Sequence, residues 1–533
     1  MTEAADTVFL DGEIHTLTDP DETYEAVAVR DGEIVRLGSS YDVEFLAGTD
    51  TDTIDLDGRV LLPGFIDAHT HLTTVGKYLI HADLSAADDL DEAVSLLRER
   101  AAETDGPDDS AWIRGYGYDE SSWPEDRYLD REDLDAVSEE RPVVAFREDM
   151  HVASVNSVVL DRYEAEMAAE NVHYEVRGSD APASQSETRS VSDAGAEPTG
   201  VLVEEAVDVL YDAVAPDAAE TGRLVAAAQA RANELGVTGV HDMVRGSYAP
   251  EVYREMDLAD ELSLRVRLNY WSDHLDAAIE TGLRTNHGSG MVRTGAIKTY
   301  TDGSFGGRTA KLSEPYHDDA DEDGSWVVDP EELDEIVQTA DEAGFQVTAH
   351  AIGDEAIDAV LDAFEQTADP GGMRHRVEHV ELASDEAIER FGEMGVIASV
   401  QPNFLKWAKA GGLYESRLGE RRTETNRYAL LDGAGAPLAF GSDCMPMDPL
   451  LGVHHAVNSE VDAQRLGVTE ALRAYTLGAA YAGFDEERLG TVETGKLADF
   501  TVLERSPWEH EAAIEEIDVA MTVVDGEVAY DGR

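Results

Sequence analysis

Two histidines separated by one residue, His69 and His71, are the first residues whose types and spacing indicate chemistry. They end the segment PGFIDAHTH at residues 63–71, which is predicted to be a strand. Side chains two residues apart on a strand point to the same face, about 6.6 Å apart along it. Both imidazoles can therefore bind one metal ion at about 2.1 Å. Such a pair becomes strong evidence for a metal site only when other ligands end other strands.

Three further residues that can bind a metal end other predicted strands. His350 closes the strand at 345–349, His379 ends the strand at 374–379, and Asp443 follows the apolar strand at 437–442. Each has an ordinary structural explanation, because strand-end histidines are often hydrogen-bonded and an aspartate after a strand often caps a helix. Their coincidence favours one metal site where the strand ends converge.

Lys298 lies in an apolar strand of a chain that has only six lysines. Burial lowers the pKa of a lysine and leaves a neutral amine. That amine can act as a nucleophile, or it can take up carbon dioxide and become a carbamate that bridges two metal ions. A Schiff-base lysine is the alternative, and the surrounding histidines favour the metal interpretation.

Eight predicted strands position these residues, and most of them are separated by helical patterns. In one such helix, Asp329 is the cap, Pro330 the first residue and Gly344 the end. The strands lie at 65–71, 237–243, 264–270, 295–300, 345–351, 374–382, 396–400 and 437–442. This alternation predicts the α/β class and a (β/α)₈ TIM barrel, whose chemistry lies at the carboxyl ends of the strands. A doubly wound open sheet is the alternative.

The two ends of the chain share a different pattern, in which apolar runs flank Asp-Gly pairs. The pairs are Asp11-Gly12, Asp31-Gly32, Asp57-Gly58 and Asp525-Gly526, and each predicts a hairpin turn. We therefore expect residues 1–60 and 490–533 to form one composite β-sandwich domain, and residues 61–489 to form the barrel. An insertion at about 105–200 follows the first barrel strand, and its acidic, Ser-rich part at 178–198 is predicted to be an exposed loop.

Segments spread over nearly the whole chain resemble the amidohydrolase superfamily. They include PGFIDAHTH (63–71), AIKTYTDGSFGGRTA (296–310), HAIGDEAID (350–358), RHRVEHVE (374–381) and GSDCMPMDPL (441–450). The resemblance is to the amidohydrolase 3 branch, which includes N-substituted formamide deformylase-like enzymes. It implies a metal-dependent hydrolase on a (β/α)₈ barrel, with a composite β domain from both termini.

The resemblance also implies roles for the site residues. His69 and His71 would bind one divalent metal, carboxylated Lys298 would bridge, and His350 and His379 would bind the second, with zinc as the expected metal. Asp443 would lie at the first metal as a proton shuttle, so that Asp443, Lys298 and His379 are the catalytic set. His375 shares the RHRVEH segment with His379 but is not included.

The implied reaction is hydrolysis of a non-peptide carbon–nitrogen bond by a metal-activated hydroxide. The substrate would be an N-substituted formamide or a linear or cyclic amide. A deaminase or an ester hydrolase on the same scaffold is the first alternative. A Schiff-base lyase and a metal-binding protein without turnover are further alternatives.

Six other residues are candidates for substrate binding, although core packing is an equal explanation for the aromatic ones. They are Tyr116, Trp123, His151, Arg308, Phe404 and Trp407. The glycine-rich segment around Arg308 lacks the spacing of a phosphate-binding loop.

The composition excludes several partners. There are 113 acidic residues against 40 basic ones, a net charge of −73, which argues against nucleic acid or anionic membranes as partners. Since 42% of the residues are hydrophobic, a folded core is expected. A single cysteine and the absence of an apolar leader predict a soluble, cytoplasmic protein. The resemblance implies a small-molecule substrate, and a homodimer is a candidate assembly.

We predict that salt stabilises this protein, because so acidic and lysine-poor a surface is typical of salt-accumulating cytoplasms. At 1 M salt the Debye length falls to about 3 Å, which screens the self-repulsion. The midpoint of thermal unfolding should rise steeply from dilute buffer to molar KCl, and much less in an uncharged osmolyte. Full stability and activity in dilute buffer would contradict the halophilic interpretation.

Overall fold

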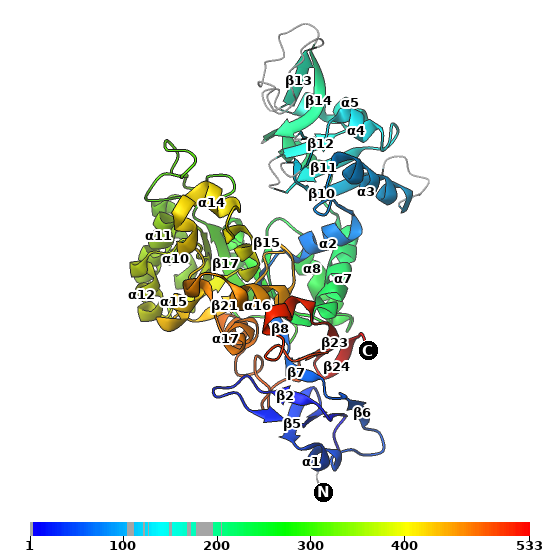
Figure 1. Cartoon of the computed structure of the whole chain (residues 1–533), viewed down its shortest axis with the longest axis vertical. Helices are drawn as coiled ribbons and strands as arrows, with labels where there is room; N and C mark the ends of the chain where they lie inside the picture. The colour runs from blue at the N-terminus through cyan, green and yellow to red at the C-terminus, as the bar shows by residue number, and fades with distance from the viewer. Residues whose placement is uncertain are drawn as a thin grey trace. The chain divides into compact units, whose positions relative to one another are not determined.

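The structure is a computed structural model that describes residues 4–103, 111–120, 123–125, 127–148, 152–167, 172–176, 196–203 and 205–533. The chain divides into two compact units (Figure 1). The first unit comprises Met1–Leu72 and Gln229–Arg533, and the second comprises Thr73–Ala228.

An eight-stranded parallel sheet forms the centre of the first unit, in the order β21-β20-β19-β18-β17-β16-β15-β8. Its strands are β8 (Phe65–Thr70), β15 (Val237–Val244), β16 (Arg265–Trp271), β17 (Val292–Tyr300), β18 (Val347–Ala351), β19 (Arg376–His379), β20 (Ile397–Val400) and β21 (Leu438–Phe440). The amides of Ser442 and Asp443, just after β21, donate to the carbonyl of His69 on β8, at 3.2 and 2.7 Å. These bonds bring the first and last strands together, and the predicted (β/α)₈ architecture is confirmed.

One glycine is required where the barrel closes. A Cβ atom on Gly441 would lie 2.4 Å from the backbone nitrogen of His69. Any larger residue would push β21 away from β8 and would displace the segment that carries Asp443.

Helices connect the strands and cover the outside of the barrel (Figure 1). The longer ones are α8 (Ala249–Leu258), α10 (Pro330–Glu342), α11 (Asp354–Glu365), α12 (Asp385–Met394) and α16 (Pro449–Asn458), and the shorter ones are α9 (Leu275–Glu280), α13 (Leu405–Ala408), α14 (Leu413–Leu418), α15 (Tyr428–Gly433), α17 (Val468–Arg473) and α18 (Ala479–Ala482). The predicted cap of α10 is present, because the Asp329 side chain accepts hydrogen bonds from the amides of Glu331 and Glu332.

Both termini build two further sheets next to the barrel in this unit. One has the order β5-β4-β1-β6, and the other has the order β24-β23-β22-β7-β2-β3. The strands are β1 (Thr7–Leu10), β2 (Glu13–His15), β3 (Thr23–Tyr24), β4 (Ala26–Arg30), β5 (Glu33–Gly38), β6 (Asp52–Asp55), β7 (Val60–Pro63), β22 (Phe500–Leu503), β23 (Val519–Val524) and β24 (Glu527–Asp531), and helix α1 (Ser40–Glu44) follows β5. Because β7 pairs with β22, residues from both ends of the chain lie in one sheet.

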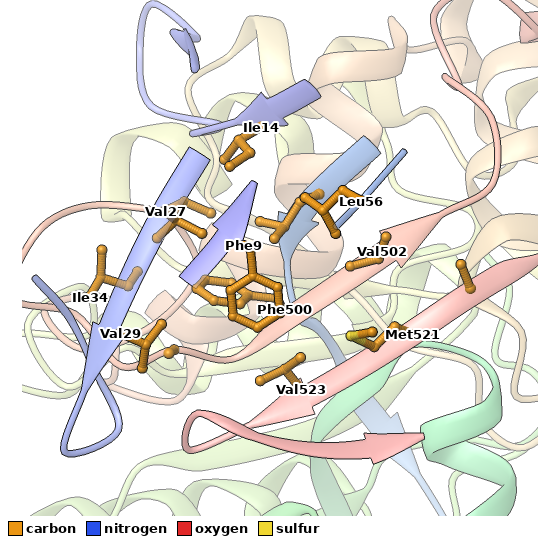
Figure 2. Close-up of a cluster of buried hydrophobic side chains, with 14 residues drawn as sticks. Phe9, Ile14, Val27, Val29, Ile34, Leu56, Phe500, Val502, Met521 and Val523 are labelled. Carbon is orange, nitrogen blue, oxygen red and sulfur yellow. The ribbon is translucent and has the colours of Figure 1, made fainter. Parts of the chain in front are cut away.

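A single apolar cluster lies among these terminal strands. Figure 2 shows Phe9 from the N-terminal part and Phe500 from the C-terminal part at its centre. Their ring centroids are 5.7 Å apart in an edge-on arrangement, and both side chains are fully buried. This cluster therefore links the two ends of the chain through packing as well as through hydrogen bonds.

The four Asp-Gly pairs differ in what they connect. Asp31-Gly32 joins the paired strands β4 and β5, and Asp525-Gly526 joins β23 and β24, as predicted. The hairpin prediction is wrong for Asp11-Gly12 and Asp57-Gly58, because each of these pairs leads from one terminal sheet to the other. The Gly58 amide donates to the Asp11 carbonyl at 2.7 Å, so the two crossings stabilise each other.

The second unit has its own six-stranded sheet, in the order β13-β14-β12-β11-β10-β9. Its elements are α2 (Leu72–Ile80), β9 (Ala82–Asp83), α3 (Leu90–Glu103), β10 (Ile113–Tyr118), α4 (Arg131–Asp135), β11 (Val143–Arg147), β12 (Val152–Val155), α5 (Ser157–Tyr163), β13 (Val172–Val176), β14 (Ala196–Val203), α6 (Glu205–Ala213) and α7 (Ala218–Glu234), whose last residues belong to the first unit. The unit is longer than the insertion expected at 105–200, because β9 pairs with β10 and α3 packs in the same core.

Most of the acidic segment predicted as a loop, at 178–198, lies outside the described residues. Its last residues, from Ala196, belong to strand β14, which pairs with β13. Within the described part of the chain, no helix is both long and apolar enough to cross a membrane.

We predict that Phe500→Ala destabilises the protein by about 3–5 kcal/mol, because it removes a buried ring from the core shared by both termini. The measurement is the shift of the denaturant unfolding curve. Phe45→Ala is the matched control, since this ring is 71% exposed, and it should change stability by at most about 0.5 kcal/mol. Equal effects of the two substitutions would contradict the importance of the shared core.

Candidate metal centre

The carboxyl ends of β8 and β21 bring three predicted ligands together. The Nε2 atoms of His69 and His71 lie 3.6 and 3.3 Å from Oδ1 of Asp443. One ligand atom from each residue lies within 4.8 Å of the other two, so the group can hold a metal ion. Asp443 has a φ of 51°, in the left-handed region that aspartate tolerates better than most residues.

His379 reaches the same centre through an unusual turn at the end of β19. Strict alternation along the strand places Glu378 on the barrel interior and turns His379 away from it. However, His379 has a φ of 74°, and the Val380 amide donates to the Glu378 carbonyl two residues before it, at 3.0 Å. This is the geometry of a classic γ-turn, which is rare and strained. The turn lets two consecutive side chains, Glu378 and His379, both reach the site.

A closed circle of ring contacts surrounds the end of the barrel. Going round, the centroid distances are 5.8 Å for His71–His69, 5.0 Å for His69–His379, 4.4 Å for His379–His350, 4.5 Å for His350–Tyr300, 5.2 Å for Tyr300–Trp271 and 6.5 Å for Trp271–His71. The four predicted histidines therefore converge, although they come from three different strands. Trp271 and Tyr300 were not predicted, and the only sequence signal for them is their position at strand ends.

In each of three imidazoles, one ring nitrogen makes a hydrogen bond to the protein, and the other ring nitrogen therefore faces the site. His69 Nδ1 lies 2.6 Å from Glu378 Oε2, and His379 Nδ1 lies 2.7 Å from Gln401 Oε1. His350 is reversed, because its Nε2 lies 2.9 Å from the carbonyl of Gly303. Since these oxygens accept hydrogen bonds, the imidazoles donate to them. The other nitrogen, Nε2 in His69 and His379 and Nδ1 in His350, keeps its lone pair for a ligand.

Burial favours the neutral form of His69, His350 and His379, which is the form that binds a metal ion. Burial lowers the pKa of His379 to about 3, and burial together with the charge of Lys298 lowers the pKa of His69. Burial by itself raises the pKa of Asp443, but the neighbouring His69 and His71 outweigh it, so the net shift is downward. The donor set of neutral nitrogens and a carboxylate oxygen fits a divalent cation such as zinc.

Lys298 lies on β17 inside the barrel and is 1% exposed. Burial lowers its pKa to about 8, against the opposing charges of Glu378 and Asp443. Its Nζ lies 5.5 Å from the centroid of the Tyr300 ring. The structure thus places this lysine within the site, with an amine that is more easily deprotonated than an exposed one.

Two buried carboxylates that support the site, Asp67 and Asp302, were not predicted from the sequence. Asp67 accepts hydrogen bonds from the backbone and side chain of Ser442, and burial raises its pKa to about 7. Asp302 accepts from the amides of Lys311, Ile352 and Gly353, and burial raises its pKa to about 7 as well. A charged residue inside an apolar strand, as Asp67 is, is the signal that identifies such positions.

His375 faces away from the centre. Its Nδ1 accepts a hydrogen bond from the Val347 amide at 3.0 Å, and its Nε2 lies 3.2 Å from Oδ1 of Asp341 on α10. Its ring stacks on Phe364 of α11. These contacts place His375 on the outer, helix-covered side of the barrel.

The candidates for substrate binding separate into two groups. Phe404 stacks on the His379 ring with centroids 5.9 Å apart, and Trp407 packs on Phe404 at 4.8 Å, so both extend the site. Arg308 lies in the loop after β17, and its guanidinium pairs with Asp318 at 2.7 Å. Trp407 is partly exposed, so a substrate can reach its side chain.

The remaining candidates belong to the second unit. Tyr116 is 3% exposed and stacks on Phe146, and Trp123 is 4% exposed and donates its Nε1 hydrogen to the carbonyl of Ala87. Both rings pack as core residues of that unit, which favours the packing explanation. His151 lies outside the described residues.

Comparison with known proteins gives matches over almost the whole chain. The model of the amidohydrolase family matches residues 52–530. The chain is 32% identical to the Bacillus subtilis (strain 168) protein named amidohydrolase YtcJ, with 98% of each chain covered. It is 26% identical to N-substituted formamide deformylase from Arthrobacter pascens, over 100% of this chain and 99% of that one.

Solved structures agree with these relatives. An uncharacterized metal-dependent hydrolase from Pyrococcus furiosus superposes with a TM-score of 0.76 at 28% identity, covering 94% of this chain and 99% of the other. A metal-dependent hydrolase from Pyrococcus horikoshii OT3 superposes with a TM-score of 0.77 at 28% identity, with 95% and 99% covered.

We predict that His379→Asn lowers the affinity for zinc by more than about tenfold, because asparagine keeps a polar group near Nδ1 but removes Nε2. The measurement is the zinc dissociation constant from competition with a chelator. His375→Asn is the matched control, since it changes a buried histidine of the same segment that faces the helices. Unchanged zinc affinity in His379→Asn would remove this residue from the metal centre.

Proposed function

Because the chain belongs to the amidohydrolase family and is therefore a metal-dependent hydrolase of carbon–nitrogen bonds, we propose that its substrate is a small amide. The substrate class is an N-substituted formamide or another linear or cyclic amide. The observation that carries the proposal is the convergence of His69, His71 and Asp443 beside buried Lys298. Similarity to N-substituted formamide deformylase along the whole chain supports the formamide as the first substrate to test.

In this proposal His69, His71 and Asp443 would hold one divalent cation, and His350 and His379 would hold a second. Zinc suits a set of imidazole and carboxylate ligands. A cation bound there supplies two effects, a lower pKa for water and a polarised carbonyl oxygen of the substrate.

Asp443 is the proposed general base and general acid. Its carboxylate is ionised at neutral pH, because neighbouring His69 and His71 lower its pKa. Oδ1 can therefore accept a proton from the attacking water and afterwards give it to the nitrogen of the departing amine. The left-handed backbone at Asp443 and Cys444, with φ values of 51° and 55°, fixes the direction of this carboxylate.

Lys298 is proposed to carry a carbamate. Its neutral amine would form a nitrogen–carbon bond with carbon dioxide and release one proton, which leaves a carboxylate at the end of the side chain. This carboxylate would add oxygen ligands between the two groups of histidines. Complete burial of Lys298 supports the proposal, because it lowers the pKa to about 8 and so favours the neutral amine that reacts with carbon dioxide.

Aromatic side chains are the proposed walls for the substrate's apolar group. Phe404 stacks on His379, and Trp407 packs on Phe404 and is partly exposed. Trp271 packs on His71 from the other side of the circle. Such surfaces suit the N-substituent of a formamide better than a strongly charged group.

We also propose that the enzyme works in a salt-rich cytoplasm. The net charge of −73 and the six lysines support this proposal. It concerns the solvent in which the enzyme works and leaves the chemistry of the site unchanged.

We predict that the metal-loaded enzyme releases formate and an amine from N-substituted formamides and that chelation abolishes this activity. A panel of formamides, linear amides, lactams, esters and amino-substituted heterocycles, assayed in high salt, separates the candidate reactions. Ammonia release from the heterocycles would instead identify a deaminase, and ester cleavage alone an esterase. Trapping of substrate by borohydride, with no effect of chelators, would identify a Schiff-base enzyme.

We predict that Asp443→Asn lowers kcat by about 10²–10⁴-fold, the usual contribution of a general acid–base residue. The assay requires equal metal content in the variant and the wild type, because Asp443 is also a proposed ligand. Near-normal kcat with metal bound would exclude the proton-transfer role. Unmodified Lys298 in a fully active enzyme, seen by mass spectrometry, would exclude the carbamate.

A further inference from the structure

Arg376 and Glu378 form a buried charged pair inside the barrel. They lie two residues apart on β19, so both point to the interior, and both are fully buried. Arg376 Nε donates to Glu378 Oε1 at 2.7 Å. A buried ion pair of this kind contributes little net stability and is costly to break. Stability alone therefore does not explain why this pair lies beside the metal centre.

The Arg376 guanidinium has acceptors on three other strands. Nη1 donates to His241 Nδ1 on β15 at 2.8 Å, and Nη2 donates to the carbonyl of Ala68 on β8 at 2.6 Å. Nη2 also donates to Ser399 Oγ on β20 at 2.8 Å. These three bonds and the one to Glu378 use a rigid planar fork that a lysine cannot reproduce. Arg376 therefore fixes the position of Glu378 relative to β8.

Glu378 connects this network to a metal ligand. Oε1 accepts from Arg376 and from the Thr348 hydroxyl on β18, while Oε2 lies 2.6 Å from His69 Nδ1. Because arginine only donates and the carboxylate only accepts, His69 must carry its proton on Nδ1. Its Nε2 then has a free lone pair, and this atom faces Asp443 at 3.6 Å.

We propose that Arg376 and Glu378 are positioning residues that set the tautomer and ring orientation of His69 and thereby set the metal affinity of the centre. The inference rests on the proposed metal set of His69, His71 and Asp443. Neither residue touches the substrate. Their effect on the reaction passes through His69, as for carboxylates that support metal-bound histidines in other proteins.

The test compares two buried carboxylates that each pair with an arginine. Glu378→Gln removes the charge next to His69 and keeps the size of the side chain. Asp499→Asn is the matched control, because Asp499 binds Arg265 through bonds of 2.7 and 2.9 Å and touches none of the proposed ligands. The side chains of this control pair are buried like those of Arg376 and Glu378, with exposures of 9% for Arg265 and 4% for Asp499.

The readouts are the dissociation constants for Zn²⁺ and Co²⁺, the visible spectrum of the Co²⁺ protein and the unfolding curve of the apoprotein. Glu378→Gln should weaken metal binding by about 10–100-fold and should change the Co²⁺ spectrum. Asp499→Asn should lower stability but leave the metal affinity within about twofold of the wild-type value, since the Arg265–Asp499 pair makes no contact with the metal centre. Arg376→Lys should weaken metal binding less than Glu378→Gln does, because the positive charge remains but the planar guanidinium fork is lost.

Wild-type metal affinity and an unchanged spectrum in Glu378→Gln would overturn the proposal. Equal weakening in Glu378→Gln and Asp499→Asn would also overturn it, since the effect would then be a general loss of packing. If Arg376→Lys does not fold, Glu378→Gln still decides. All readouts are independent of substrate, so a failure to find a hydrolysable amide would leave this result unaffected.

Discussion

The metal centre depends on holding charged and polar groups inside a barrel that is otherwise closely packed and apolar. Removing a charge from water is expensive unless partners surround it. Arg376 and Glu378 meet this requirement together, because their bonds reach β8, β15, β18, β19 and β20. The same bonds that compensate the buried charges also fix the relative positions of the strands whose ends carry the ligands.

Backbone strain occurs at two points where ligands leave their strands. His379 occupies the centre of a γ-turn, and Asp443 and Cys444 both have positive φ values. Conformations of this kind cost about 1–3 kcal/mol each and persist only when the surroundings impose them. The surroundings here are the closure of β21 onto β8 and the approach of Gly441 to His69. The stability of the closed barrel therefore compensates the cost of these strained conformations at the site.

The terminal sheets give that barrel its support. Gly64, directly before β8, donates to the carbonyl of Asp499, and Arg265 at the start of β16 pairs with the Asp499 side chain. Both contacts tie the amino ends of barrel strands to the sheet formed by the two termini. The chemistry at the carboxyl ends is thus separated from the part of the structure that joins the chain ends.

The sequence by itself determined the strand segments and the α/β alternation and nominated the candidate metal ligands, because apolar periodicity and ligand types are local properties. It also indicated the cap at Asp329. Tertiary structure alone decided which imidazole nitrogen faces the site, since the acceptors Glu378, Gln401 and Gly303 come from elsewhere in the chain. It also decided that Asp11-Gly12 crosses between sheets. Pairing of distant strands sets these features, and no local pattern in the sequence encodes it.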